Sequence, residues 1–248
     1  MASTKQFVPK LVMALSVLLG GGSLLLFALF LVIGPVSLVS LGVSEQGILL
    51  SNAFLSGLFF LQHSVMVRLP FQTWLASVVE RHYHPSIYAI ASGIVLSAVV
   101  LLWQPSQTVV FHAEGLLRMA ARAVSALAVI GFIWGARSLG SFDSFGLIAL
   151  KVHLCGRQLR PPEFVLRGPY RWVRHPLYFF VILLIWSNPD LTVDRLLFNI
   201  LWTLWIVVGT LLEERDLLAA FGERYRRYQK TVPMLIPWRF LPFWRGHN

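Results

Sequence analysis

Apolar residues gather along the chain into long runs that are separated by short polar segments. The first run, residues 11–33, is 23 residues long and contains no charged residue. That length is enough to cross a bilayer core of about 30 Å. It is also too long for the apolar region of a signal peptide, so we expect a helix that is retained in the protein. The next apolar runs predict further membrane spans at residues 47–67, 86–103 and 116–135.

The apolar pattern changes in the C-terminal part. Residues 176–187 form an apolar run of only 12 residues, and after a break at Asn188-Pro189-Asp190 a second run covers residues 196–212. This pattern predicts a tight helical hairpin. Residues 213–230 then place apolar and aromatic side chains at helical spacing, with arginines opposite, which is typical of an amphipathic helix at a membrane surface.

Together these elements predict an all-α, polytopic membrane protein with five or six transmembrane helices. We expect one domain, residues 1–248, with N-terminal transmembrane helices in residues 1–135 and a functional C-terminal half in residues 136–248. The composition agrees, because 56% of the residues are hydrophobic, 13% are charged and the mean hydropathy is +0.69. Such a chain has lipid as its main solvent.

The net charge is +10, which indicates either nucleic acid or an anionic membrane face as a partner. We expect no nucleic-acid binding, because the basic residues lie between apolar spans. Alternate spans place 18 of the 21 lysines and arginines on one side of the membrane. The positive-inside rule therefore predicts that both termini and the polar segments at 68–85 and 136–175 face the cytoplasm, at the inner membrane in a bacterium. The single cysteine, Cys155, excludes an intrachain disulfide framework.

A dense polar segment, residues 167–178, interrupts this apolar chain with the sequence Arg-Gly-Pro-Tyr-Arg-Trp-Val-Arg-His-Pro-Leu-Tyr. Gly168-Pro169 predicts a turn. Pro176 has its φ angle preset for the first turn of a helix, and it pushes His175 toward an extended conformation outside that helix.

The free amides at this helix start, together with Arg171 and Arg174, predict a positive pocket suited to a carboxylate or another anion. The alternative is that the glycine and proline form only a turn and the arginines only an interfacial belt.

Two adjacent carboxylates, Glu213 and Glu214, stand at the end of the last predicted span. Charges near hydrocarbon are costly and usually face a partner or a cavity. A zwitterionic ligand that also carries a positive charge would satisfy both the acidic pair and the basic segment.

Histidines elsewhere leave alternatives open. His63 lies in the second predicted span and is either a functional residue or a satisfied hydrogen-bonding partner between helices. His82 and His84 alone make a poor metal site, so we expect no metal.

Three motifs resemble one family of membrane enzymes. They are Gly-Pro-Tyr-x-x-x-Arg-His-Pro-x-Tyr at residues 168–178, Glu-Glu at 213–214 and Tyr-x-x-Tyr-x-x-x-Val-Pro at 225–233. The combination resembles the integral-membrane methyltransferases related to isoprenylcysteine carboxyl methyltransferase and phospholipid methyltransferases. Gln62-His63-Ser64-x-Met66-x-Arg68, Glu80-Arg81 and Trp103-Gln104-Pro105 resemble the nurim-like branch, which includes bacterial methanethiol S-methyltransferases. The resemblance covers residues 50–237.

The resemblance implies S-adenosylmethionine as the cofactor, bound by the C-terminal half. Glu213 and Glu214 would engage its ammonium group or ribose. His175, Glu214 and Arg215 are the candidates for helping a thiol to lose its proton, and methyl transfer itself needs no metal. The residues that the resemblance assigns to cofactor binding are Arg167, Gly168, Pro169, Tyr170, Arg174, His175, Pro176, Tyr178, Glu213 and Glu214.

The implied reaction is methyl transfer to a small apolar thiol such as methanethiol, which gives dimethyl sulfide. The resembling enzymes carry an Asn-His-Phe-Asp-type segment where this chain has Gly140-Ser141-Phe142-Asp143, so the acceptor stays open. The alternatives are a prenylcysteine carboxylate, a phospholipid or another lipid-like acceptor drawn from the membrane, or a non-enzymatic nurim-like membrane protein.

Overall fold

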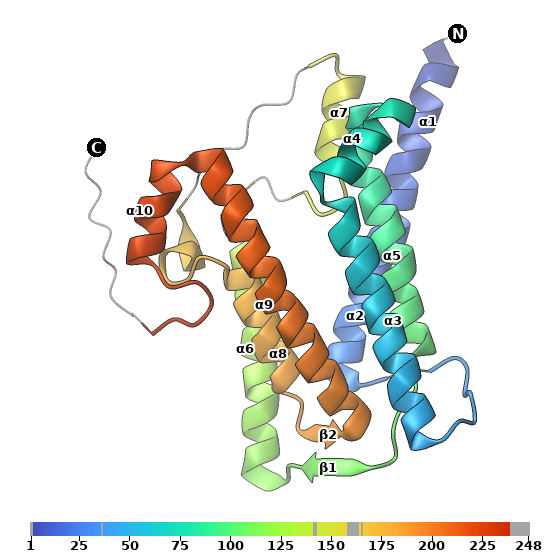
Figure 1. Ribbon diagram of the computed structural model, residues 1–248, viewed down its shortest axis with the longest axis vertical. Coiled ribbons are helices and arrows are strands. Elements are labelled where there is room, and N and C mark those ends of the chain that lie inside the picture. Colours follow the sequence, from blue (N-terminus) through green and yellow to red (C-terminus); the bar gives the residue numbers. More distant parts are fainter. Residues whose placement is uncertain (1, 36, 141–142, 158–163, 165, 239–248) are drawn as a thin grey trace. The chain divides into compact units, whose positions relative to one another are not determined.

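The computed structural model describes residues 2–35, 37–140, 143–157, 164 and 166–238. These residues are mostly helical, as predicted (Figure 1). Contacts divide the chain into two compact units, residues 1–107 with 143–161 and residues 108–142 with 162–248. The expectation of one domain stays a prediction. In the described part, the helices long and apolar enough to cross a membrane are Gln6–Ile33, Glu45–Met66, Arg81–Leu102, Gly115–Ser138 and Val193–Phe221. The chain is therefore a multi-pass membrane protein.

The first unit contains a long N-terminal helix, which packs against α5 at glycines. This helix includes a π-helical turn, η1. A Cβ on Gly93 of α5 would lie 2.5 Å from the carbonyl oxygen of Leu19, so only glycine allows this backbone-to-backbone approach. The elements of the unit are α1 (Ala2–Leu15), η1 (Ser16–Gly21), α2 (Gly22–Ile33), α3 (Glu45–Met66), α4 (Leu69–Val78), η2 (Arg81–Tyr83), α5 (His84–Leu102) and α7 (Leu147–Leu154).

A buried amide pair fixes the end of α5. Asn52 of α3 is fully buried, accepts from the backbone N–H of Gln104 at 2.9 Å and donates to the carbonyl of Gln104 at 2.7 Å. The side chain of Gln104 in turn bonds the backbone of Leu41 and Val39. Asn52 therefore satisfies main-chain groups that helix geometry would leave unpaired at this point.

We expect Asn52→Leu to lower the stability of the first unit by about 2–5 kcal/mol, because the side chain keeps its volume while two buried backbone groups lose their partners. Thermal unfolding in detergent, followed by tryptophan fluorescence, measures the change. The matched control is Ser51→Ala, since among the described residues the Ser51 hydroxyl bonds within its own helix, to the carbonyl of Ile48. Equal melting temperatures for the two variants would contradict the assignment.

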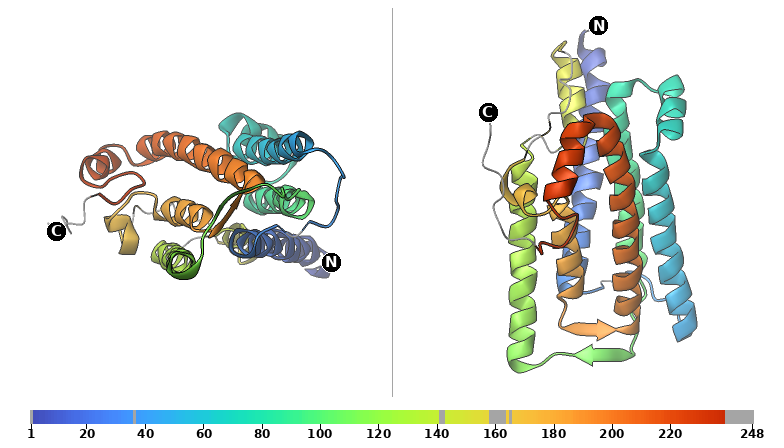
Figure 2. Two further views of the ribbon diagram at one scale, coloured as in Figure 1. Left: turned by 90° about the horizontal axis from the view of Figure 1, so that it is seen from below. Right: turned by 60° about the vertical axis from the view of Figure 1, so that its left-hand side comes forward.

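The second unit contains β1 (Val109–His112), α6 (Gly115–Ser138), η3 (Gly168–Arg171), α8 (Pro176–Trp186), β2 (Asp190–Thr192), α9 (Val193–Phe221) and α10 (Glu223–Thr231). Helices α6 and α8 lie side by side (Figure 2), and Gly131 makes room for the ring of Phe180. Strands β1 and β2 pair antiparallel, with His112 opposite Asp190. Arg118 at the start of α6 donates to both carboxylate oxygens of Asp190, at 3.0 and 2.7 Å.

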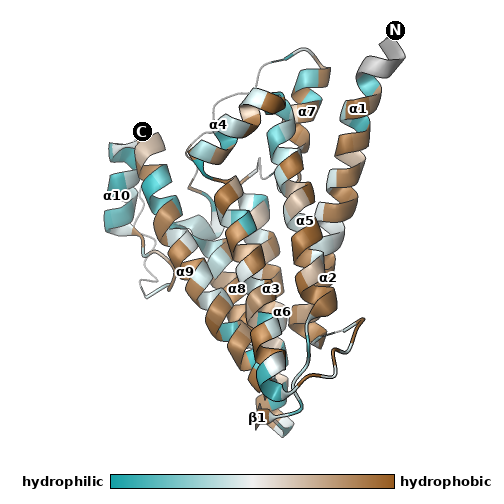
Figure 3. Cartoon of the chain, turned by 45° about the vertical axis from the view of Figure 1, so that its right-hand side comes forward, coloured by the Kyte–Doolittle hydropathy of each residue, from teal (hydrophilic) through white to brown (hydrophobic). Residues whose placement is uncertain are grey.

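The predicted boundaries of the spans at 47–67, 86–103 and 116–135 agree with the structure within a few residues. The first helix already begins at Ala2, before the predicted start at residue 11, and the prediction also differs near the C-terminus. Helix α9 does not end with the apolar run at Leu212 but continues to Phe221, where Gly222 (φ +54°) breaks it. The prediction of a single amphipathic helix over residues 213–230 is therefore wrong. Its first residues belong to α9, and α10 is a separate helix. Charged residues do not end a helix when they have partners, whereas a glycine at positive φ does. Figure 3 shows α10 as largely hydrophilic and α9 as largely apolar.

Candidate active site

The backbone around Arg174 and His175 has the predicted form. Pro176 is the first residue of α8, and His175 precedes it with non-helical angles (φ −121°, ψ 66°). The N–H groups of Arg174 and His175 donate to the carbonyls of Pro233 and Met234, at 2.9 and 3.1 Å. The chain segment after α10 thus holds both residues in place through their backbones.

Gly168 opens η3 at a position that strongly favours glycine. Its φ is +55°, and an added Cβ would lie 2.2 Å from the hydroxyl oxygen of Ser138 at the end of α6. The positive φ therefore favours glycine, and any larger residue would also displace the Ser138 side chain.

We expect Gly168→Ala to destabilise the second unit by about 1–3 kcal/mol through backbone strain, with the steric clash adding to this. The control is Gly140→Ala, since Gly140 also has a positive φ (+67°) but open space around its Cβ position. Differential scanning fluorimetry of the two variants measures the difference, and an equal loss in both would show that the contact with Ser138 carries no weight.

A buried carboxylate lies at the centre of the polar segments. Glu214 of α9 is 7% exposed. Arg174 donates to both of its oxygens, Nε to Oε1 at 2.8 Å and Nη2 to Oε2 at 2.9 Å. The ring Nε2 of His175 lies 2.7 Å from Oε1, the hydroxyl of Tyr225 donates to Oε1 at 2.6 Å, and the amide of Gln229 donates to Oε2 at 2.6 Å. The cost of a charge near hydrocarbon is offset here by a bidentate arginine and neutral donors.

The same arginine reaches two backbone carbonyls. Nη1 of Arg174 donates to the carbonyls of Gln229 and Val232. All three nitrogen atoms of the Arg174 guanidinium thus donate to acceptors within the protein. Arg171, in contrast, is exposed. The predicted anion pocket stays a prediction, and in this arrangement it would depend on Arg171 and on helix amides rather than on Arg174.

Two tyrosines of α10 complete the cluster around the Glu214 carboxylate. Tyr225 and Tyr228 are buried against Phe164, and the hydroxyl of Tyr228 donates to the carbonyl of Tyr170. Burial first, and then the hydrogen bond to Glu214, raise the pKa of Tyr225 above its ordinary value. Burial also raises the pKa values of Tyr228 and Tyr170. These phenols therefore remain protonated, and Tyr225 remains a donor, across the physiological pH range.

Glu213 lies on the other side of His175. Its Oε2 is 3.7 Å from Nδ1 of the imidazole and, among the described residues, has no hydrogen-bond partner although the atom is buried. The ring of Tyr178 stacks on the imidazole, with centroids 5.7 Å apart and planes within 9°. Arg215, the third predicted catalytic candidate, has an exposed side chain.

The structure thus brings Arg174, His175, Tyr178, Glu213 and Glu214 together. Among the other predicted cofactor residues, Pro169 is buried and Arg167 is exposed. Sequence reasoning missed Tyr225 and Gln229 as partners of Glu214. The Tyr-x-x-Tyr motif pointed to the first, but nothing in the sequence pointed to Gln229.

The N-terminal motif forms a separate polar cluster in the first unit. The hydroxyl of Tyr88 lies 2.8 Å from the ring of His63, and Nε2 of Gln62 donates to the hydroxyl of Ser92 at 3.3 Å. His63 therefore has a hydrogen-bonding partner on the neighbouring helix, which was one of the two alternatives that the sequence left open. Asp143 accepts from the backbone N–H groups of residues 147 and 148 and so caps α7, while Ser141 and Phe142 lie outside the described residues.

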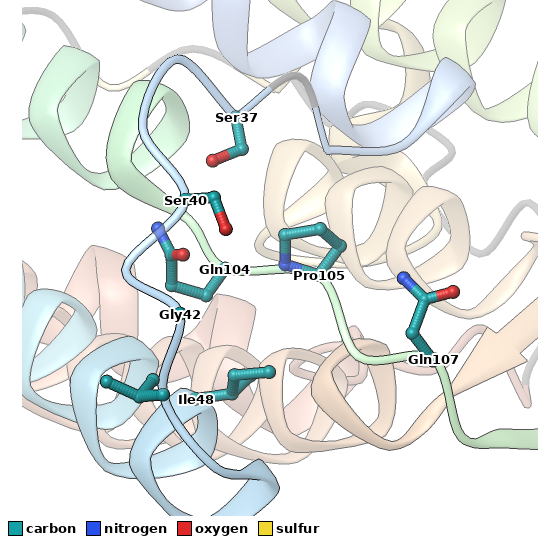
Figure 4. Close-up of a pocket in the computed structure, with 8 residues that line it drawn as sticks. Ser37, Ser40, Gly42, Ile48, Gln104, Pro105 and Gln107 are labelled. Carbon is teal, nitrogen blue, oxygen red and sulfur yellow. The ribbon is translucent and has the colours of Figure 1, made fainter.

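Gln104 and Pro105 of the Trp103-Gln104-Pro105 motif line a pocket of about 200 Å³ in the first unit (Figure 4). Ser37, Ser40 and Gln107 also line it, and none of its lining residues is ionisable. The pocket therefore offers hydrogen bonds but no acid or base.

Comparison with known proteins finds relatives that align with most of the chain. The chain is 37% identical over 189 residues to methanethiol S-methyltransferase 1 of Bradyrhizobium diazoefficiens, which covers 76% of this chain and 66% of that relative. It is 37% identical over 201 residues to methanethiol S-methyltransferase of Pseudomonas deceptionensis, covering 79% of this chain and 75% of the relative. The chain belongs to the methanethiol S-methyltransferase family. The chain is also 27% identical over 211 residues to nurim of Sus scrofa, covering 75% of this chain and 73% of nurim.

No family model matches this member of the methanethiol S-methyltransferase family, and no solved structure does.

Proposed function

We propose that this protein transfers a methyl group from S-adenosylmethionine to methanethiol or a similar small thiol, giving dimethyl sulfide. The observation that carries the proposal is the buried cluster around Glu214. It joins the three C-terminal motifs of the sequence within one unit, and in the described part of the chain it leaves Oε2 of the neighbouring Glu213 without a hydrogen-bond partner. The choice of methanethiol as the methyl acceptor rests on the names of the relatives, which are methanethiol S-methyltransferases.

The residues present fit a cofactor that offers cationic or hydroxyl donors. Glu214 already accepts three hydrogen bonds at Oε1 and two at Oε2, so it acts in our proposal as the frame of the site. Oε2 of Glu213 is buried without a partner in the described part of the chain. The ammonium group or the ribose of the cofactor would satisfy that oxygen, since a buried acceptor is costly to leave unpaired. The rest of the cofactor site would be lined by Gly168, Pro169, Tyr170 and Tyr178.

S-adenosylmethionine supplies, when bound, a methyl group on a positively charged sulfur that needs no further activation. The protein then has to orient the thiol and take its proton, because a thiol with a pKa near about 8.5 is mostly protonated at neutral pH. We assign this to His175. Its Nε2 faces the acceptor Glu214 and so carries the ring hydrogen, which leaves Nδ1 free to accept a proton.

In this scheme the S–H bond of the thiol breaks and its proton passes to Nδ1 of His175. The thiolate left beside His175 would then accept the methyl group that the cofactor would supply. Glu213, 3.7 Å from Nδ1, would stabilise the resulting imidazolium. No metal takes part. By the distribution of basic residues, we place this site and both termini on the cytoplasmic side.

The test is a methyl-transfer assay with purified protein in liposomes, in which methanethiol, farnesylcysteine and phosphatidylethanolamine are offered in separate reactions. We expect dimethyl sulfide, detected by gas chromatography, only in the methanethiol reaction. Methylation of farnesylcysteine or of the lipid instead would establish the alternative acceptor. No binding of S-adenosylmethionine in equilibrium dialysis would favour the non-enzymatic alternative.

A further inference from the structure

Two histidines far apart in sequence meet in the first unit. His82 belongs to η2, before α5, and His153 lies near the C-terminal end of α7. Their rings stack with centroids 3.6 Å apart and planes within 10°. Glu80 adds a carboxylate, with Oε2 3.5 Å from Nδ1 of His82. The contact between α7 and η2 thus assembles three side chains whose ligand atoms all lie within 4.8 Å of one another.

A buried nitrogen in this group lacks a partner. Among the described residues, Nε2 of His82 makes no hydrogen bond although the atom is buried, and the side chain as a whole is only 14% exposed. Buried polar atoms are nearly always paired, so an orphan nitrogen indicates a ligand or a water. The neighbouring His84 differs, since its Nε2 lies 3.0 Å from the carbonyl oxygen of Val79. The sequence pair His82 and His84 is therefore the wrong pair to consider.

We propose that Glu80, His82 and His153 bind one divalent transition-metal ion. Two imidazoles and one carboxylate are the ligands that zinc, cobalt and nickel accept, whereas magnesium and calcium prefer oxygen ligands alone. Bonds of about 2.0–2.2 Å require the ligand atoms to move closer together. The exposed His153 ring and Glu80, whose side chain is 75% exposed, would have to rotate for this.

The ion has no part in methyl transfer in our proposal. It would join α7 to the turn between α4 and α5, since His153 comes from the first and His82 from the second. Its expected effect is to stabilise the first unit, because an ion that binds only the folded state raises stability by mass action. The sequence predicted no metal because His153 lies about 70 residues from His82, and neither periodicity nor motif spacing connects them.

The experiment uses the full chain, purified in detergent without a histidine tag and stripped with a chelator, and titrated with zinc or cobalt. We expect one ion per chain by elemental analysis, a cobalt absorption spectrum typical of nitrogen and oxygen ligands, and a higher melting temperature with zinc. His153→Ala and Glu80→Gln should each weaken zinc binding at least about tenfold, a loss of about 1.4 kcal/mol.

Two control variants separate the site from general histidine binding. His84→Ala and His112→Ala remove histidines that bond a carbonyl and Asp190, and both should bind zinc as the unmodified chain does. His153 is exposed, so its variant should melt like the unmodified chain in the absence of metal. Less than one ion per chain at micromolar zinc would overturn the proposal, and so would unchanged affinity in His153→Ala. If His82→Ala fails to fold, His153→Ala and Glu80→Gln still decide.

Discussion

Glu214→Gln should destabilise the second unit by about 3–5 kcal/mol and abolish most methyl transfer, because it leaves the buried guanidinium of Arg174 without its counter-charge. The Arg174 and Glu214 side chains are 10% and 9% exposed. Glutamine keeps the volume, but its NH₂ group would face donors from Arg174, His175 or Gln229. We expect a fall in melting temperature on the order of 10 °C and a fall in transfer rate of at least about a hundredfold, measured by scanning fluorimetry and dimethyl sulfide release.

Glu223→Gln is the matched control for this substitution. Glu223 forms an ion pair with Arg226 at 2.8 Å on the exposed face of α10, with side chains 71% and 55% exposed. Exposed pairs of this kind contribute less than about 1 kcal/mol. The double variant Arg174→Met with Glu214→Leu should regain part of the stability but none of the activity, because it removes both buried charges. If Glu214→Gln melts like Glu223→Gln, the cluster does not hold the unit together.

The spans could be predicted from the sequence because lipid imposes a simple rule: a helix that crosses hydrocarbon needs a long apolar run. The start of α8 could be predicted for an equally local reason, since proline fixes its own φ and restricts the residue before it. The end of α9 could not be predicted from apolarity. It depends on Gly222 and on the neutralisation of Glu214, and the partner that neutralises it, Arg174, lies 40 residues earlier.

The sequence does not reveal which residues far apart in the chain contact each other. The motifs name Arg174, His175 and Glu214, but they do not say that Arg174 faces the glutamate rather than an anionic ligand. Asn52 illustrates the same point in the first unit, because a polar residue in a span suggests function while its two bonds to Gln104 indicate a structural role. Only coordinates separate the two possibilities.

Glu213→Gln should weaken binding of S-adenosylmethionine by about 10- to 100-fold while leaving the melting temperature close to that of the unmodified chain. Its neighbour Glu214 is saturated by protein donors, whereas Oε2 of Glu213 has none in the described part of the chain, so its charge is available to the cofactor. A charged hydrogen bond contributes about 1.5–3 kcal/mol, which corresponds to that range of affinity. Isothermal titration calorimetry in detergent measures the dissociation constant.

The two adjacent glutamates should therefore respond in opposite ways. Successive residues of a helix point about 100° apart, so one carboxylate can face the protein while the other lies beside the imidazole of His175. Glu213→Asp keeps the charge on a shorter side chain and should recover part of the affinity, whereas Glu223→Gln, on the exposed face of α10, should leave it unchanged. Unchanged affinity in Glu213→Gln would show that the cofactor's positive charge is met elsewhere, and the assignment of Glu213 would then be wrong even if Glu214 behaves as expected.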